Sequence, residues 1–190
     1  MRGGMKALIL AGVVATAMAP AQARAEGYIS PFAGVHFGND QLEKKAVYGA
    51  DAGFMGKGII GAEVDFGWAP NAFDESVDNH LLDVMGNVII GIPIGGTRGA
   101  GVRPYVTGGL GMIQTKISSG VSGVPDFDQK DFGFNLGAGA MGFFSNHVGL
   151  RGDVRYFRTI NNNDSSLNNG LNLDLGSFDF WRATVGLVIR

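Results

Sequence analysis

Three charged side chains alternate along one short segment, Arg151-Gly152-Asp153-Val154-Arg155. In a β-strand successive side chains point to opposite faces, so the two arginines and the aspartate share one face. Charged groups that face a narrow, poorly hydrated space must pair with one another, because an unpaired buried charge is costly. If the candidate strands close into a barrel, the same alternation predicts an ionic network in its lumen, and Arg103 lies near the rim of that lumen. The residues of this luminal ionic network are Asp51, Glu63, Asp65, Asp83, Arg151, Asp153, Arg155 and Arg182.

Catalysis and metal binding have little support in these residues. Glu63 and Asp65 lie two positions apart on one strand face, a spacing that acid–base pairs can use, but no nucleophile or oxyanion motif accompanies them. The histidines His36, His80 and His147 lack metal-ligand spacing and are expected at the surface. Glycine runs such as GGLG lack the strand-to-helix context of a phosphate loop. We therefore expect no enzyme activity, no metal and no cofactor.

The segment 134–157 predicts the hairpin that positions the arginines. Its first half alternates apolar residues with Asn135, Gly137 and Gly139, and its second half carries the arginines beyond a polar corner at 145–147. Glycines on the inward face leave room for large guanidinium groups beside them. Arginine offers planar, bidentate pairing to carboxylates, and no lysine occurs in the inward set. We expect Glu63, Asp65 and Asp83 to be the partners, without assigning individual pairs.

Alternating patterns define eight candidate strands, at 28–37, 48–55, 59–68, 80–92, 102–113, twice within 134–157, and at 178–190. Long polar loops are expected at 38–46, 70–79, 115–130 and 159–176, after every odd-numbered strand, with shorter connections after the others. The pattern predicts an all-β fold, an eight-stranded antiparallel up-and-down transmembrane barrel with its N- and C-termini on the periplasmic side. The alternative is a soluble sandwich whose charged residues form its wet face.

The composition and the N-terminal segment indicate the cellular compartment of the protein. The chain has 190 residues, 32 of them glycine, no cysteine and a net charge of −2, which is unlike a nucleic-acid binder. Residues 1–25 read as a cleaved secretory signal peptide with a basic start, an apolar stretch and the cleavage motif Ala23-Arg24-Ala25. A short membrane anchor is the alternative reading. The mature domain is then 26–190, and none of it contains an apolar run of about 18 residues.

Aromatic residues gather toward the ends of the candidate strands. Membrane barrels place such residues in girdles at the two interfaces, whereas soluble folds use them in the core. The interfacial aromatics predicted here are Phe37, Phe66, Trp68, Phe134, Tyr156 and Trp181.

Several segments resemble one known pattern: GAEVDFGW (61–68), MGNVIIGIPIGG (85–96), RPYVTGGLG (103–111), FNLGAGAMGFFSNHVGLRGDVRYFR (134–158) and FWRATVGL (180–187). They resemble the bacterial outer-membrane β-barrel domain family, small porin-like proteins of the OmpA/OmpX type. The resemblance implies the outer membrane of a Gram-negative cell envelope, with membrane lipid, lipopolysaccharide and the outer-membrane assembly machinery as partners. The chain departs from it at Arg190, where family members commonly carry an aromatic residue.

Three functions remain open at this point. The first is a structural or surface-interaction role, in which a monomeric barrel with a packed ionic lumen contacts its surroundings through long extracellular loops. The second is a narrow or gated channel for ions or small solutes. The third is a soluble periplasmic ligand-binding barrel. Fold alone does not choose among them.

Overall fold

A computed structural model describes residues 25–38, 45–71, 79–117, 127–160 and 179–190, and within them the chain forms eight β-strands and no helix. The strands are β1 (Ala25–Phe37), β2 (Ala46–Gly56), β3 (Ile60–Pro70), β4 (Asn79–Gly91), β5 (Gly101–Ile117), β6 (Phe127–Phe143), β7 (Val148–Thr159) and β8 (Asp179–Ile189). The predicted export signal lies outside the described residues except for Ala25, which pairs with Gly56 at the start of β1.

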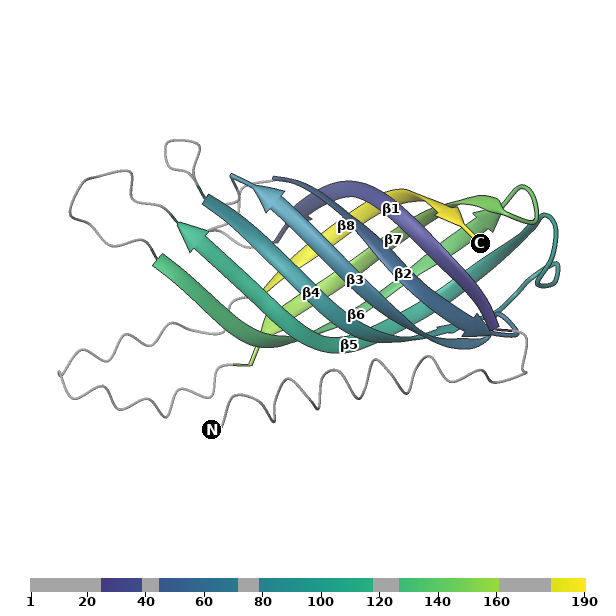
Figure 1. Cartoon of the computed structure of the whole chain (residues 1–190), viewed down its shortest axis with the longest axis horizontal. Helices are drawn as coiled ribbons and strands as arrows, with labels where there is room; N and C mark the ends of the chain where they lie inside the picture. The colour runs from purple at the N-terminus through teal and green to yellow at the C-terminus, as the bar shows by residue number, and fades with distance from the viewer. Residues whose placement is uncertain (1–24, 39–44, 72–78, 118–126, 161–178) are drawn as a thin grey trace.

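The strands close into a barrel in simple sequence order. Each strand pairs antiparallel with the next, and β8 pairs back onto β1 from Ile29↔Ile189 to Phe37↔Trp181. Figure 1 shows the strands tilted around a common axis. Closure leaves no free strand edge, which is a requirement for sheet that crosses a membrane. The predicted eight-stranded antiparallel up-and-down barrel is therefore confirmed.

Alternation along each strand separates the inside from the outside. In β3, Glu63 and Asp65 are buried, whereas Val64 and Phe66 are 52% and 46% exposed. The outward face of the barrel is almost wholly apolar, with exposed Ile, Val, Leu, Met, Phe, Tyr and Trp side chains from all eight strands. Such a continuous apolar surface matches a lipid environment and would cause aggregation in water.

Two apolar clusters fill the lumen above and below its charged middle. One includes Leu81, Met85 and Phe157, and the other includes Met55, Ile89 and Met141. All six side chains are fully buried. The strand registers place the first cluster toward the end where β1, β3, β5 and β7 finish, and the second toward the opposite end. The lumen is thus filled by layers of side chains in this region.

The two ends of the barrel differ in their connections. The long-loop end carries the connections 38–45, 71–78, 118–126 and 160–178, most of which lie outside the described residues. The short-turn end carries 57–59, 92–100 and 144–147, together with Ala25 and Ile189. In the 57–59 turn, Lys57 and Gly58 have φ of 51° and 70°, and Ile59 N–H donates to Gly56 C=O at 3.0 Å. These values define a type I′ hairpin turn.

Two expectations about the connections were wrong. Residues 115–130 are not one loop, because β5 continues to Ile117 and β6 begins at Phe127, with Gln114 paired to Lys130. Polar residues continue the strand pairing there, and their hydropathy resembles that of a loop. The connection 92–100 is also as long as 118–126, so the contrast between the two ends is weaker than expected. This connection folds back onto the start of β5 through reciprocal hydrogen bonds between Ile94 and Val102, at 2.9 and 3.0 Å.

Candidate functional site: the luminal ionic network

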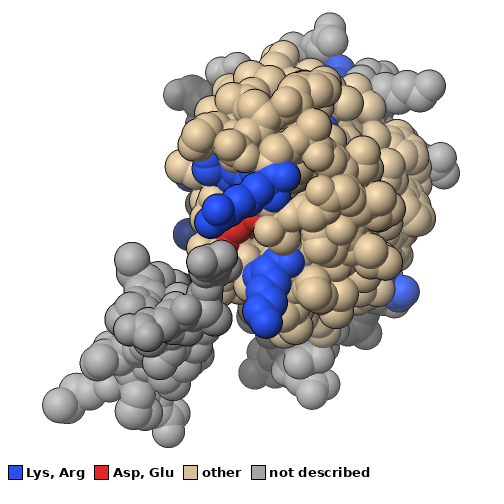
Figure 2. Space-filling view, turned by 90° about the vertical axis from the view of Figure 1, so that its right-hand side faces the viewer, with Lys and Arg blue, Asp and Glu red and all other residues tan. Residues whose placement is uncertain are grey.

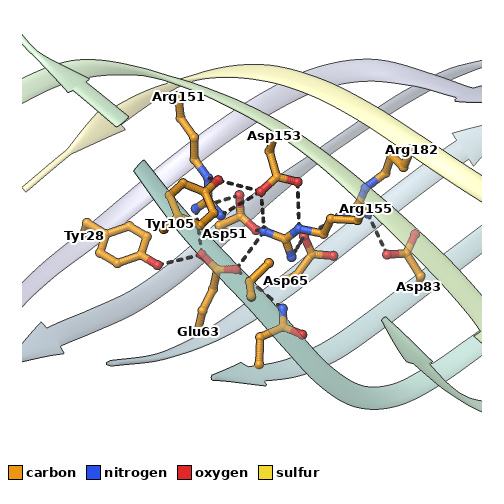
Figure 3. Close-up of polar contacts among 12 residues, drawn as sticks. Tyr28, Asp51, Glu63, Asp65, Asp83, Tyr105, Arg151, Asp153, Arg155 and Arg182 are labelled. Carbon is orange, nitrogen blue, oxygen red and sulfur yellow. Dashed lines mark hydrogen bonds and ion pairs between the residues drawn. The ribbon is translucent and has the colours of Figure 1, made fainter. Parts of the chain in front are cut away.

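Arg155 is the centre of the charged layer. Its guanidinium lies 2.8 Å from Asp153 and Glu63, 2.9 Å from Asp65 and 3.4 Å from Asp51. These carboxylates come from β2, β3 and β7, and Figure 3 shows them converging on Arg155 inside the barrel. A planar guanidinium has five donors, so one arginine can satisfy several carboxylates at once.

Arg151 lies four residues before Arg155 on β7, nearer the short-turn end. Both carboxylates and tyrosine hydroxyls contact its guanidinium. Its Nη1 is 2.6 Å from Glu63 Oε2 and 3.2 Å from Asp51 Oδ2, and its Nε donates to the Tyr105 hydroxyl oxygen at 2.6 Å. Tyr28 O–H donates to Glu63 at 2.6 Å, and Tyr105 O–H donates to Asp153 at 2.5 Å. The guanidinium also stacks over the Tyr105 ring, 4.9 Å from its centroid.

Arg182 extends the network toward the long-loop end. It bridges Asp65 at 2.5 Å and Asp83 at 2.7 Å. Its guanidinium lies 4.6 Å from the Phe157 ring centroid and 5.0 Å from that of Phe32. Arg182 therefore connects the ionic layer to the apolar cluster on that side.

Strand β6 contributes space rather than charge. Gly137 and Gly139 pair with Arg155 and Asp153 on the neighbouring strand. A Cβ atom at Gly137 would lie 2.6 Å from Arg155 Cγ, and one at Gly139 would lie 2.7 Å from Tyr105 Cζ. Both distances are too short for real side chains, so these two positions admit glycine because of the groups that fill the lumen beside them.

The structure places all eight residues of the predicted network inside the barrel and joins each of them to at least one other by an ion pair. Arg103 stands apart at the short-turn end, where it pairs with Glu26 at 3.0 Å. The predicted network did not include Tyr28 and Tyr105, which bond to Glu63 and Asp153. An inward tyrosine beside inward acids was the available signal.

One expectation about the histidines was wrong. His36 is not at the surface but fully buried, with its ring 4.8 Å from that of Phe180. It faces the lumen on β1, directly opposite Arg182 on the neighbouring strand β8. His80 is half-buried and His147 is exposed.

The six predicted interfacial aromatics all lie in the half of the barrel nearer the long-loop end and on its outer face. Phe66, Trp68 and Trp181 are exposed, and the others are half-exposed. Three form a cluster, with Tyr156 at 5.2 Å from Trp181 and 6.4 Å from Phe134, between ring centroids. Phe37 stacks on Trp181 at 6.5 Å.

The network contains five carboxylates, Asp51, Glu63, Asp65, Asp83 and Asp153, and three guanidiniums, Arg151, Arg155 and Arg182. Its formal charge is therefore −2 if every group is ionised. Nothing in the arrangement resembles a nucleophile with an adjacent base. Among the described residues no group of three or more His, Cys, Asp or Glu side chains is placed to hold a metal ion. What the arrangement does chemically is to link opposite walls of the lumen.

A closed barrel with an apolar exterior and a charged, packed interior defines the class of integral membrane β-barrels. The sequence profile of the outer membrane protein beta-barrel domain matches residues 7–186, and the chain belongs to this family. It is an outer-membrane β-barrel protein. No curated protein sequence matches the chain. Within the described residues, no helix has the length and apolar character needed to cross a membrane.

Solved structures share the fold at low sequence identity. Neisserial surface protein A is 17% identical with a TM-score of 0.64, over 87% of this chain and 97% of that one. The N-terminal barrel domain of Pseudomonas aeruginosa OprF is 16% identical with a TM-score of 0.58, over 87% and 96%. The attachment invasion locus protein Ail of Yersinia pestis, in complex with the heparin analogue sucrose octasulfate, is 14% identical with a TM-score of 0.53, over 86% and 97%.

Proposed function

We propose that this protein is a closed, non-conducting barrel of the outer membrane that acts through the connections at its long-loop end. Its transmembrane part is a rigid support, and its lumen is a core rather than a pathway. The connections at the long-loop end then face the outside of the cell, and both termini face the periplasm. Its contacts would be surface lipopolysaccharide or a host molecule.

The observation that carries the proposal is the bridge from β7 to β3 across the lumen. In a ring of eight strands these two are diametrically opposed, and Arg155 and Arg151 both reach Glu63 across that diameter. Arg182 on β8 likewise reaches Asp83 on the opposed strand β4. An eight-stranded barrel is just wide enough for side chains to fill. Salt bridges that span it, with an apolar layer on either side, leave little room for a solute.

Two of the proteins with similar folds support a surface role. One is described as a surface protein, and another as an attachment and invasion protein that was solved with a sulfated heparin analogue. The connections 38–45, 71–78, 118–126 and 160–178 all leave one end of the barrel, so they offer a shared site for such contacts. The identity between these chains and this one is too low to transfer a ligand.

A narrow or gated channel is the second candidate, and specific luminal atoms favour it. Ser30 Oγ, both ring nitrogens of His36 and both side-chain amide atoms of Asn135 are buried without a protein partner. Buried polar atoms of this kind are commonly satisfied by internal water. Together with the formal charge of −2, they would suit a thin water-filled path that prefers cations. A soluble periplasmic barrel does not fit the apolar outer face.

Surface labelling of intact cells tests the proposed orientation, on which a surface role depends. An epitope tag inserted within 161–178 should bind antibody on intact cells, whereas the same tag inserted within 92–100 should bind only after the outer membrane is permeabilised. Both insertions should leave heat-modifiable gel migration unchanged, which shows that the barrel has folded. Labelling of the 92–100 tag on intact cells, with none at 161–178, would contradict the proposed orientation.

A further inference from the structure

The short-turn end of the barrel is hollowed into a recess whose lining includes three cationic side chains, Lys57, Arg98 and Arg190. The recess has a volume of about 670 Å³, and its lining includes Glu26, Lys57, Arg98, Asn146, His147 and Arg190. Figure 2 looks onto this end and shows Lys and Arg side chains grouped around a small acidic surface. The residues come from β1, from Arg190 directly after β8, and from all three connections of this end.

One carboxylate shared by two arginines forms the floor of the recess. Glu26 lies 2.8 Å from Arg190 Nη1 and 3.0 Å from Arg103 Nη2. Both guanidiniums also stack on the Phe143 ring, at 3.8 and 5.2 Å from its centroid. Arg103 is almost fully buried, so the floor is part of the packed interior of the barrel.

The walls of the recess are tied to this floor. Arg190 Nε donates to Asn146 C=O at 2.8 Å, and Arg190 Nη2 donates to Gly99 C=O at 3.0 Å. Asn146 Oδ1 in turn accepts from Gly99 N–H at 2.7 Å. The connections 92–100 and 144–147 are therefore held together around Arg190. A ligand that enters the recess would meet a preformed surface and would not have to order these loops.

The charge of the recess is not balanced. Lys57 and Arg98 are exposed and form no ion pair with another described residue. With Arg103 and Arg190 they make four cations against the single carboxylate of Glu26, a formal excess of +3 among these groups. Lysine and arginine at this density recognise phosphate through charge-assisted hydrogen bonds.

The three connections that contribute to the recess also carry exposed apolar side chains. Ile59, Ile92 and Phe144 are 49%, 67% and 67% exposed. A lipid whose chains pack against these residues would carry its phosphate toward Lys57 and Arg98. Basic groups near a membrane surface attract anionic lipids electrostatically.

We propose that this recess is a phosphate-binding site that holds the head group of an anionic phospholipid of the inner leaflet. Lys57 and Arg98 contact the phosphate, His147 and Asn146 add polar contacts at the wall, and the Arg190–Glu26–Arg103 floor shapes the recess. The proposal does not depend on whether the lumen conducts, and only its choice of the inner leaflet rests on the proposed orientation of the barrel.

Native mass spectrometry of the folded protein in an uncharged detergent tests the site. Wild-type protein mixed with phosphatidylglycerol and phosphatidylcholine should retain phosphatidylglycerol preferentially. Lys57→Gln and Arg98→Gln should each lower its apparent affinity about fivefold, and the double variant about twentyfold, since each removes one exposed charge-assisted contact. Lys130→Gln is the matched control, because Lys130 is equally exposed but lies on β6 toward the long-loop end. Heat-modifiable migration checks that each variant is folded. If Lys57→Gln, which lies in a turn, fails to fold, the affinity of Arg98→Gln alone tests the site.

A soluble probe separates the two sources of phosphate. If glycerol 3-phosphate displaces phosphatidylglycerol and shifts the amide NMR signals of Lys57 and Arg98, the site recognises the phosphate group itself. If only the lipid binds, the apolar contacts are needed as well, and the proposal stands in its lipid form. Equal retention of the two lipids by wild-type protein would overturn the proposal. So would an equal loss in Lys130→Gln, because that loss would show attraction to the overall charge rather than to the recess.

Discussion

Arg155 Nη2 lies 2.8 Å from Glu63 Oε1, which joins β7 to the strand directly opposite it in the ring. Asp65, two residues along the same strand, lies 2.9 Å from Arg155 Nη1. The guanidinium thus makes two contacts with one wall while its backbone belongs to the other. This cross-brace, repeated by Arg182 and Asp83, explains both how the charged lumen is stable and why we expect it to be closed.

Removing one side of the brace should destabilise the barrel. Arg151→Ala or Glu63→Ala leaves charged partners buried and unpaired, which costs about 3–5 kcal/mol. Urea-induced unfolding in lipid vesicles, followed by heat-modifiable migration, measures the change. Lys130→Ala, at an exposed position on β6 toward the long-loop end, is the control and should change stability little. Equal stability of Arg151→Ala and wild-type protein would show that the network contributes nothing.

Arg155→Lys should also be destabilising although it preserves the charge. Arg155 meets four carboxylates with its Nε, Nη1 and Nη2 atoms, and a lysine ammonium is a single point with three donors. We expect a loss smaller than that of Arg155→Ala in the same unfolding assay. A lysine variant as stable as wild-type protein would mean that charge alone, without the planar fork, holds the lumen together.

A charged residue on the lipid-facing surface should impair folding of the barrel in lipid. Val64 and Val154 are 52% and 43% exposed on the outer surface, near the middle of their strands. An arginine at either position should cost about 2–4 kcal/mol in lipid. Folding yield in vesicles measures this. Thr107→Arg should impair folding differently, through crowding, because Thr107 is buried and donates to Val88 C=O at 3.2 Å. Normal folding of both valine variants would show that the assignment of inside and outside is wrong.

Adding a methyl group at Gly137 should disturb the network through packing alone. The new Cβ would lie 2.6 Å from Arg155 Cγ and 2.7 Å from Val154 C=O, so either the arginine or the strand must shift. We expect Gly137→Ala to lose about 1–3 kcal/mol of stability. Gly152→Ala is the matched control, since nothing lies within 4 Å of its Cβ position. If the two variants unfold at the same urea concentration, the glycines of β6 do not serve to make room.

Processing at the predicted cleavage site should leave Glu26 as the first residue. Cleavage there removes Ala25 and with it only one residue pair of β1 and β2, Ala25 with Gly56. Glu26, which forms ion pairs with both Arg103 and Arg190, is kept. N-terminal sequencing of protein extracted from outer membranes should therefore read Glu26-Gly27-Tyr28 first. A sequence that begins before Glu26 would contradict the predicted site.

The face of each strand could be predicted because alternation is local: Glu63, Asp65, Arg151 and Arg155 each follow from their neighbours in sequence. The individual pairs could not, because they depend on which strands oppose one another once the barrel has closed. The burial of His36 was missed because surface exposure is the commoner state for a histidine. The continuation of β5 and β6 was missed because residues such as Gln114 and Lys130 are polar whether they lie in a loop or in a strand.

The steady conductance of wild-type protein in planar lipid bilayers tests the closed lumen most directly. We predict little steady conductance for wild-type protein, and a higher conductance for Arg151→Ala or Glu63→Ala, because loss of a brace admits water between the apolar layers. Val64→Ala, on the outer face of the same strand, should stay as closed as wild type. A wild-type barrel that conducts steadily, with Glu63→Ala changing only its preference between cations and anions, would contradict the closed lumen and favour the channel.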